Sequence, residues 1–255
     1  MVELKTPAEL ALMREAGRVT ATVLATVREQ AKAGVALREL DEVAVEVLAA
    51  AGARSSFLNY HPRFAPTPYP AVLITCVNDA IVHAIPNDYR LRDGDVLSVD
   101  FAAELGGFHG DSAFTVAIGE VAEQDRLLIE RTREALEAGI AAAVPGGHLS
   151  DVSHAVGVIG RAHGYGIPSD FGGHGVGRRM HEDPSVANEG RPGRGLRLRP
   201  GLVIAIEPMF MAGGHDQYRT APDGWALHTV DGSNAAHFEH TIAVTEDGPV
   251  ILTSL

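Results

Sequence analysis

Apolar residues at helical spacing open the chain. The segment Thr6-Pro-Ala-Glu9 offers a capping hydroxyl, a proline at the first helical position and a glutamate three residues after the cap. The pattern predicts a helix from there to Gly34 and a second helix over about residues 37–51. Four prolines lie among aromatic residues between 59 and 70, so we expect a loop there.

Short apolar runs after this loop predict buried strands over residues 71–77, 96–101 and 108–118, the last after a Gly106-Gly107 turn. The scheme is then repeated. A long amphipathic helix is expected over about 122–144, a shorter one over about 149–164, and apolar strands over 202–206 and 241–244.

The two halves of the sequence correspond in detail. Leu37-x-Glu-Leu resembles Leu149-x-Asp-Val, and Gly-Asp-Val-Leu-Ser-Val-Asp at 94–100 resembles Gly-Leu-Val-Ile-Ala-Ile-Glu at 201–207. We infer a helix-helix-strand unit used twice, over about 1–120 and 121–255, with chance similarity as the alternative. This predicts one α/β (α+β) domain over residues 1–255, with pseudo-twofold symmetry, sheet inside and helices outside.

Composition narrows the function classes. The chain has 33 Asp+Glu against 21 Lys+Arg, a formal charge of −12, which argues against a nucleic-acid binder. No apolar stretch approaches the roughly 18 residues of a membrane span. A single cysteine and the absence of a signal-type apolar run in the first ten residues predict a cytoplasmic protein.

Acidic residues end two of the apolar runs, where core residues are expected. Asp100 follows residues 96–99 and Glu207 follows 202–206, and a buried charge is costly unless it is paired or coordinated. A tight hairpin at Gly106-Gly107 would place Asp100 nearly opposite Asp111, where like charges destabilise the pair. A cation or a shared proton would relieve that repulsion.

The candidate ligands are Asp100, Asp111, Glu207 and Glu239, with His174 between glycines. Four carboxylates carry four negative charges, which two divalent ions balance. Such donors suit Mn²⁺, Fe²⁺, Co²⁺ or Zn²⁺ rather than a structural zinc site, and two ions activate water for hydrolysis. The alternative for each acid is an ordinary solvated turn residue.

Three rival motifs are weaker. The glycines around His174 lack the Lys-Ser/Thr of a phosphate loop, and Ser112 lacks the flanks of a nucleophile elbow. Cys76 lies within an apolar run, which is typical of a small core residue.

The chain resembles the type I methionine aminopeptidases in an ordered set of segments. The matching segments are 78–86, 99–100, 109–111, 173–177, 181–184, 206–209 and 238–241. The resemblance covers nearly the whole chain and is to the compact bacterial form. It implies the pita-bread fold and a metal-dependent removal of the initiator methionine when the second residue is small.

The resemblance also implies roles for the acidic cluster. Asp100 would bind one ion, His174 and Glu207 the other, and Asp111 and Glu239 would bridge both. Glu207 would take the proton of the attacking water and pass it to the leaving amine.

Four further residues match the family's substrate site. His181 would contact the scissile carbonyl oxygen, and His83 would lie near the second residue of the substrate. Tyr69 and Trp225 would line the methionine pocket, with core packing as their alternative. The departures from the family pattern all concern this pocket: Val82, Ala84, Met180 and a longer loop over 61–68.

The implied partners are the N-termini of nascent polypeptides, met at the ribosome, although the sequence has no basic docking patch. The protein would be a monomer with two divalent ions (Co, Mn, Fe or Zn) and no direct nucleic-acid site. One alternative is an X-Pro peptidase of the same fold, which usually carries an added N-terminal domain. The other is a binding protein that kept the fold and lost its ligands, whereas all the metal positions are present here.

Overall fold

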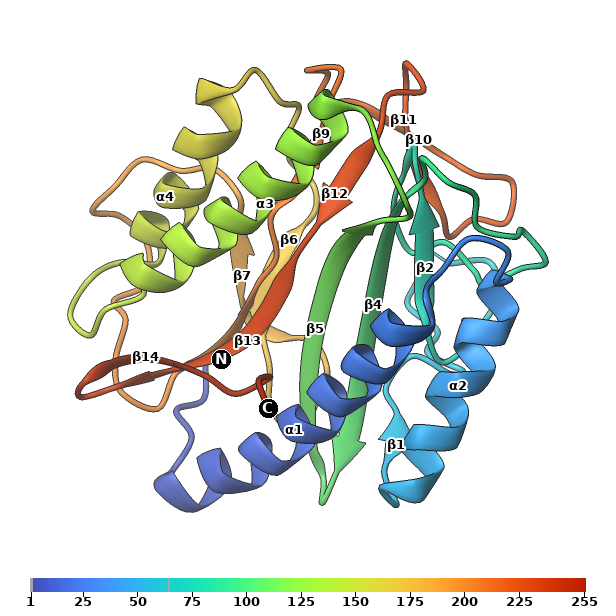
Figure 1. The fold of residues 1–255 in the computed structure, drawn as a ribbon. Coiled ribbons are helices and arrows are strands. Elements are labelled where there is room, and N and C mark those ends of the chain that lie inside the picture. Colours follow the sequence, from blue (N-terminus) through green and yellow to red (C-terminus); the bar gives the residue numbers. More distant parts are fainter. Residues whose placement is uncertain (1, 64) are drawn as a thin grey trace.

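The computed structural model describes residues 2–63 and 65–255, and Figure 1 shows their arrangement. Within these residues the chain forms four helices, which are α1 (Pro7–Gln30), α2 (Leu37–Ala50), α3 (Glu123–Ala142) and α4 (Leu149–Ala162). The strands are β1 (Arg54–Ser55), β2 (Ile74–Val77), β3 (Ala80–Val82), β4 (Val96–Leu105), β5 (Phe108–Ala117), β6 (Gly172–Gly175), β7 (Glu182–Ala187), β8 (Val203–Ile206), β9 (Met209–Met211), β10 (Tyr218–Thr220), β11 (Leu227–Thr229), β12 (Ala235–His237), β13 (Glu239–Thr245) and β14 (Gly248–Ile251).

Antiparallel pairing joins both halves of the chain into one curved sheet. Its strand order over the described residues is β1-β4-β5-β13-β8-β6-β7, with β2 added to β4 and β14 added to β13. The helices cover one face of this sheet, with α1 and α2 over its first half and α3 and α4 over its second (Figure 1). Two smaller sheets, β10-β11-β3 and β12-β9, adjoin it. None of the described helices has the length and apolar character needed to span a membrane.

The predicted cap of α1 is confirmed. The Thr6 hydroxyl accepts the Glu9 N–H, and the Glu9 carboxylate accepts the Thr6 N–H at 3.0 Å. The helix ends at Gln30, four residues before the predicted stop. Ala31 is already extended, and the N–H of Gly34 donates to the carbonyl of Leu91 at 2.7 Å, so a tertiary contact takes the chain out of the helix.

The inferred repeat has equivalent contacts in both halves. Glu39 accepts the Ala36 N–H before α2, and Asp151 accepts the His148 N–H before α4, both at 2.8 Å. These acidic residues therefore begin the second helix of each half in the same way.

The turn before the central strand is also repeated. Gly94 and Gly201 have φ angles of 94° and 91°, which glycine adopts at no steric cost. Their N–H groups donate to Ile118 and Val244, at 2.8 and 2.9 Å. The two carboxylates that follow these turns, Asp100 and Glu207, thus enter the fold by matching routes.

The β4–β5 hairpin differs from the expected register. Gly106 and Gly107 both have positive φ and form a two-residue turn, so Leu105 pairs with Phe108. Asp100 consequently pairs with Ala113, and Asp111 pairs with Ala102. The two acids are diagonal neighbours rather than directly opposed, which still brings their side chains within reach of each other.

The first strand of the sheet core is shorter than expected. Residues 71–73 lie outside β2, because the N–H groups of Val72 and Leu73 donate to the Asp41 carboxylate at 3.0 and 2.8 Å. A side chain of α2 thus replaces the ladder partner.

Helix α1 packs with almost no space against the strand that carries Asp111. A Cβ at Gly17 would lie 2.2 Å from the carbonyl oxygen of Leu252, and a Cβ at Gly110 would lie 2.8 Å from the Gly17 Cα. Both glycines are therefore required by close backbone approach rather than by backbone angles.

We predict that Gly17→Ala lowers the free energy of unfolding by about 1–3 kcal/mol, the usual cost of overpacking. The control is Leu12→Ala on the exposed side of the same helix, with an expected change within about 0.5 kcal/mol. Denaturant unfolding measures both variants. Equal stability of Gly17→Ala and the unsubstituted protein would contradict this view of the interface.

Candidate metal centre and substrate cavity

A cavity of about 390 Å³ is lined by every residue that the sequence assigned to the site. None of the described residues lining it belongs to a helix, so the sheet and its loops alone build it. The candidate ligands come from separate strands: Asp100 from β4, Asp111 from β5, His174 from β6, Glu207 directly after β8, and Glu239 from the start of β13. The structure therefore brings the whole predicted set together, and the role of each residue stays a prediction.

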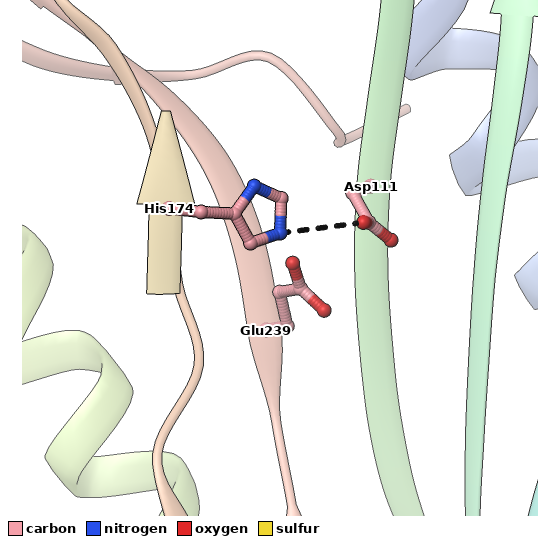
Figure 2. Close-up of side chains that lie close together, drawn as sticks. All are labelled: Asp111, His174 and Glu239. Atoms are coloured by element: carbon pink, nitrogen blue, oxygen red, sulfur yellow. Dashed lines mark ion pairs between the residues drawn. The ribbon is translucent and has the colours of Figure 1, made fainter. Parts of the chain in front are cut away.

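Figure 2 shows the centre of this cluster, where Asp111, His174 and Glu239 point toward one another from three strands. The Nε2 atom of His174 lies 3.8 Å from Asp111 Oδ2 and 3.5 Å from Glu207 Oε1. One ligand atom from each of Asp111, His174 and Glu239 lies within 4.8 Å of the other two, a spacing that suits a shared metal ion.

The tautomer of His174 suits a ligand. Its Nδ1 lies 2.9 Å from the carbonyl oxygen of Gly175, which can only accept, so Nδ1 carries the proton and Nε2 keeps its lone pair. Burial lowers the pKa of His174 to about 4, so the ring is neutral at pH 7. Steric crowding explains why glycine precedes His174, because a Cβ at Gly173 would lie 2.1 Å from the carbonyl oxygen of Ala205.

The acidic side chains are held in an unfavourable environment. Burial raises the pKa of Asp111 to about 7, and burial together with the nearby Asp111 raises the pKa of Glu207 to about 8. The pKa values of Asp100 and Glu239 are raised well above their usual range by burial first and then by the neighbouring carboxylates. Without a compensating charge, these groups are forced to retain protons.

The residues fit a divalent metal. Asp100 Oδ1, Asp111 Oδ1 and Glu239 Oε1 are buried oxygens without a hydrogen-bond partner among the described residues. An unsatisfied buried oxygen is costly, and a cation satisfies it together with the repulsion between the carboxylates. Carboxylate oxygens with an imidazole nitrogen are donors that divalent transition metals accept.

Backbone contacts hold the ligands in place. The Thr241 hydroxyl accepts the Asp111 N–H at 3.0 Å and donates to the Asp111 carbonyl at 2.8 Å. The side-chain amide of Asn188 donates to the Glu207 carbonyl at 3.0 Å. The backbones of these two candidate ligands are therefore held by residues of β13 and of the segment after β7.

The predicted substrate histidines, His181 and His83, line the same cavity. The ring of His181 contacts that of His174, with centroids 4.2 Å apart and the ring planes tilted by 52°, and its Nδ1 lies 3.0 Å from the hydroxyl of Tyr60. Burial and then the neighbouring His174 lower the pKa of His181 to about 3. His83 has a φ of 63°, a left-handed conformation that non-glycine residues rarely adopt, and its ring meets Trp225 edge-on.

Aromatic rings form an apolar end of the cavity. Tyr69 and Trp225 pack edge to face at 5.0 Å, and Met180 joins the same buried cluster. The Tyr69 hydroxyl donates to the Leu73 and Ala84 carbonyls, both at 2.9 Å, which fixes the ring. The two aromatic residues are thus both core and cavity wall.

Sequence reasoning missed two residues of the site. Tyr60 belongs to the proline-rich loop, where no periodicity relates it to His181, so nothing in the sequence pointed to this contact. His237 is buried beside Glu207 and Glu239. Its nearness to Glu239 in the sequence was the only signal, because His237 ends β12 and Glu239 begins β13, so no periodicity of a single strand relates them.

The rival motifs do not form reactive sites. Cys76 is a buried core residue, and burial raises the pKa of its thiol to about 12. The Ser112 hydroxyl donates to the Glu239 carbonyl at 2.6 Å. The glycines around His174 form β6 rather than a loop before a helix.

Comparisons with known proteins agree with this geometry. Residues 11–246 match metallopeptidase family M24. The methionine aminopeptidase 1 of Bacillus subtilis is 42% identical over 253 residues, which cover 99% of each chain. The crystal structure of methionine aminopeptidase from Thermotoga maritima has a TM-score of 0.95 and 38% identity, with complete coverage of both chains.

A more distant solved structure shares the fold alone. The prolidase of Pyrococcus furiosus has a TM-score of 0.79 at 23% identity, and the match covers 99% of this chain but 65% of the prolidase. The expected pita-bread architecture is thereby confirmed, while the X-Pro peptidase alternative is not favoured. Matched over most of its length, the chain belongs to metallopeptidase family M24.

Proposed function

We propose that the chain is a methionine aminopeptidase that removes the first methionine of nascent polypeptides when the second residue is small. The observation that carries the proposal is the buried cluster of carboxylates with unsatisfied oxygens, lying in a cavity with an aromatic end. Full-length relatives with that name support the same activity. The partner of the protein is then the nascent polypeptide, and its compartment is the cytoplasm. The protein would act as a monomer with one catalytic domain over residues 1–255.

Two divalent ions, Co, Mn, Fe or Zn, would be held by Asp100, Asp111, His174, Glu207 and Glu239. The charge balance supports two ions, since four ionised carboxylates carry four negative charges. When bound, such ions polarise a carbonyl and lower the pKa of water.

The chain's own residues then handle the proton and the carbonyl. Glu207 takes the proton of the attacking water and returns it to the leaving amine. With Tyr60 as donor to Nδ1, the neutral ring of His181 keeps its proton on Nε2, where it donates to the carbonyl oxygen as charge develops. His83 binds near the second residue of the substrate.

The aromatic end of the cavity would bind the methionine side chain. A thioether packs favourably against aromatic rings, and the rings of Tyr69 and Trp225 are fixed by hydrogen bonds to backbone carbonyls. Met180 completes the wall. A rigid apolar pocket of this kind selects an unbranched apolar side chain.

We expect the protein with Mn²⁺ or Co²⁺ to release methionine from Met-Ala-Ser and not from Met-Lys-Ser. Asp111→Asn should lower the rate by more than about a hundredfold, because even partners of metal ligands cost about 10- to 100-fold. Asp88→Asn, an exposed acid remote from the cavity, is the matched control and should retain activity. Chromatography of the free methionine released from each peptide measures the activity. If the folded protein releases no methionine with any metal, the proposal is refuted.

Tyr60→Phe should lower kcat by about tenfold with little change in KM, less than the 10²–10³ lost with a direct oxyanion donor. The substitution frees His181 to place its proton on Nδ1, so fewer molecules present the donor. Tyr165→Phe, at the remote α4 end, is the matched control. An unchanged kcat in Tyr60→Phe would exclude this tyrosine from setting the tautomer.

The metal-free protein should lose stability as pH rises from about 6.5 to 8. Acids with a folded-state pKa above the unfolded value bind more protons when folded, so the free energy of unfolding falls as pH rises toward the folded pKa. Asp111 at about 7 and Glu207 at about 8 act in this window. The buried histidines, with folded-state pKa values lowered to about 3 or 4, change the free energy of unfolding only at pH values below about 6.5, the pKa of an unfolded histidine.

Urea unfolding at several pH values measures this loss, which should be on the order of 2 kcal/mol for the metal-free protein. Glu207→Gln should reduce the pH dependence of the free energy of unfolding, and Asp88→Asn should leave it unchanged. Saturating metal should abolish it, because the ions replace the protons. A flat profile without metal would show that these carboxylates are not perturbed.

A further inference from the structure

A second imidazole lies inside the acidic cluster. The Nε2 atom of His237 is 3.9 Å from Glu207 Oε2 and 3.9 Å from Glu239 Oε2. The side chain is 2% exposed, and this nitrogen has no hydrogen-bond partner among the described residues. A buried nitrogen that faces two carboxylates without bonding either one calls for a physical reason.

The distances suit a shared ion better than a hydrogen bond. A hydrogen bond between nitrogen and oxygen requires about 2.7–3.2 Å, and His237 is beyond that range from both carboxylates. Two ligand atoms that each lie about 2.1 Å from one ion are about 3.0 to 4.2 Å apart, depending on the angle at the ion. His174, at 3.5 and 3.8 Å from its carboxylates, has the same spacing.

The backbone places His237 as it places Asp111. The Thr115 hydroxyl accepts the His237 N–H at 2.9 Å and donates to the His237 carbonyl at 2.6 Å. Thr241 makes the same two contacts with Asp111. Thr115 follows Asp111 by four residues, and Thr241 follows His237 by four residues. The pair of Glu239 and Ala113 in β13 and β5 lies midway between the two contacts. His237 and Asp111 thus occupy equivalent positions about a local twofold axis.

We propose that His237 is an additional metal ligand that binds, through Nε2, the ion held by Glu207 and Glu239. Glu207 then lies between two imidazoles, with Oε1 toward His174 and Oε2 toward His237. The inference rests on the proposed metal-dependent function and adds a ligand to it. A neutral nitrogen leaves the charge balance unchanged and raises the affinity for Co²⁺, Zn²⁺ or Fe²⁺ relative to Mn²⁺.

X-ray absorption of the full-length protein loaded with Co²⁺ tests the inference, since imidazole rings give a recognisable outer-shell signal. With the metal content measured separately, the unsubstituted protein should show two bound imidazoles per chain. His237→Gln and His174→Gln should each show one. His237→Gln should also bind Co²⁺ about 10- to 100-fold more weakly in calorimetric titration, with a smaller loss for Mn²⁺.

His240→Gln is the matched control and should keep both imidazoles. It removes a half-buried histidine of the same segment, whose Nδ1 forms a hydrogen bond with the Thr253 hydroxyl at 2.9 Å. One imidazole per chain in the unsubstituted protein would overturn the assignment, even if His237→Gln fails to fold. If the unsubstituted protein shows one imidazole and His174→Gln shows none, the proposed function stands without the additional ligand. If no Co²⁺ binds at all, both the proposed function and the additional ligand are refuted.

Discussion

Repulsion among four clustered carboxylates, three of them on buried residues, is the constraint on which the site depends. Burial raises the pKa values of Asp100, Asp111, Glu207 and Glu239, and the neighbouring carboxylates raise those of Asp100, Glu207 and Glu239 further. Flexible segments would separate under this repulsion. Here each acid belongs to, or directly follows, a strand of one antiparallel sheet, so the backbone ladder opposes the separation and a bound cation would compensate the remaining charge.

The same physics explains why the sequence could single out the acidic residues that cluster in the structure. A carboxylate at the end of an apolar run is conspicuous in a sequence, because burial of a charge needs compensation. The repeated turns at Gly94 and Gly201 place Asp100 and Glu207 at matching points, so the internal repeat located half of the acidic cluster. The cap of α1 was predictable for a local reason, since all of its groups lie within four residues.

Long-range contacts account for what the sequence did not predict. The end of α1 is set by the contact of Gly34 with Leu91, and the start of β2 is set by Asp41, which lies more than thirty residues away. Strand β6 consists mostly of glycine, which has low strand propensity, and glycine is needed there because neighbouring carbonyls leave no room for a Cβ. Tyr60 meets His181 only through the tertiary fold.

The N-terminal arm supports the loop that carries His181. The Lys5 ammonium is almost fully buried and pairs with the Glu182 carboxylate at 2.9 Å, while the Lys5 N–H donates to the Gly201 carbonyl at 2.6 Å. Removal of one partner of a buried ion pair costs about 3–5 kcal/mol, because the other charge is left uncompensated. Lys5 thus joins the segment next to His181 to the turn that precedes β8 and Glu207, although it does not line the cavity itself.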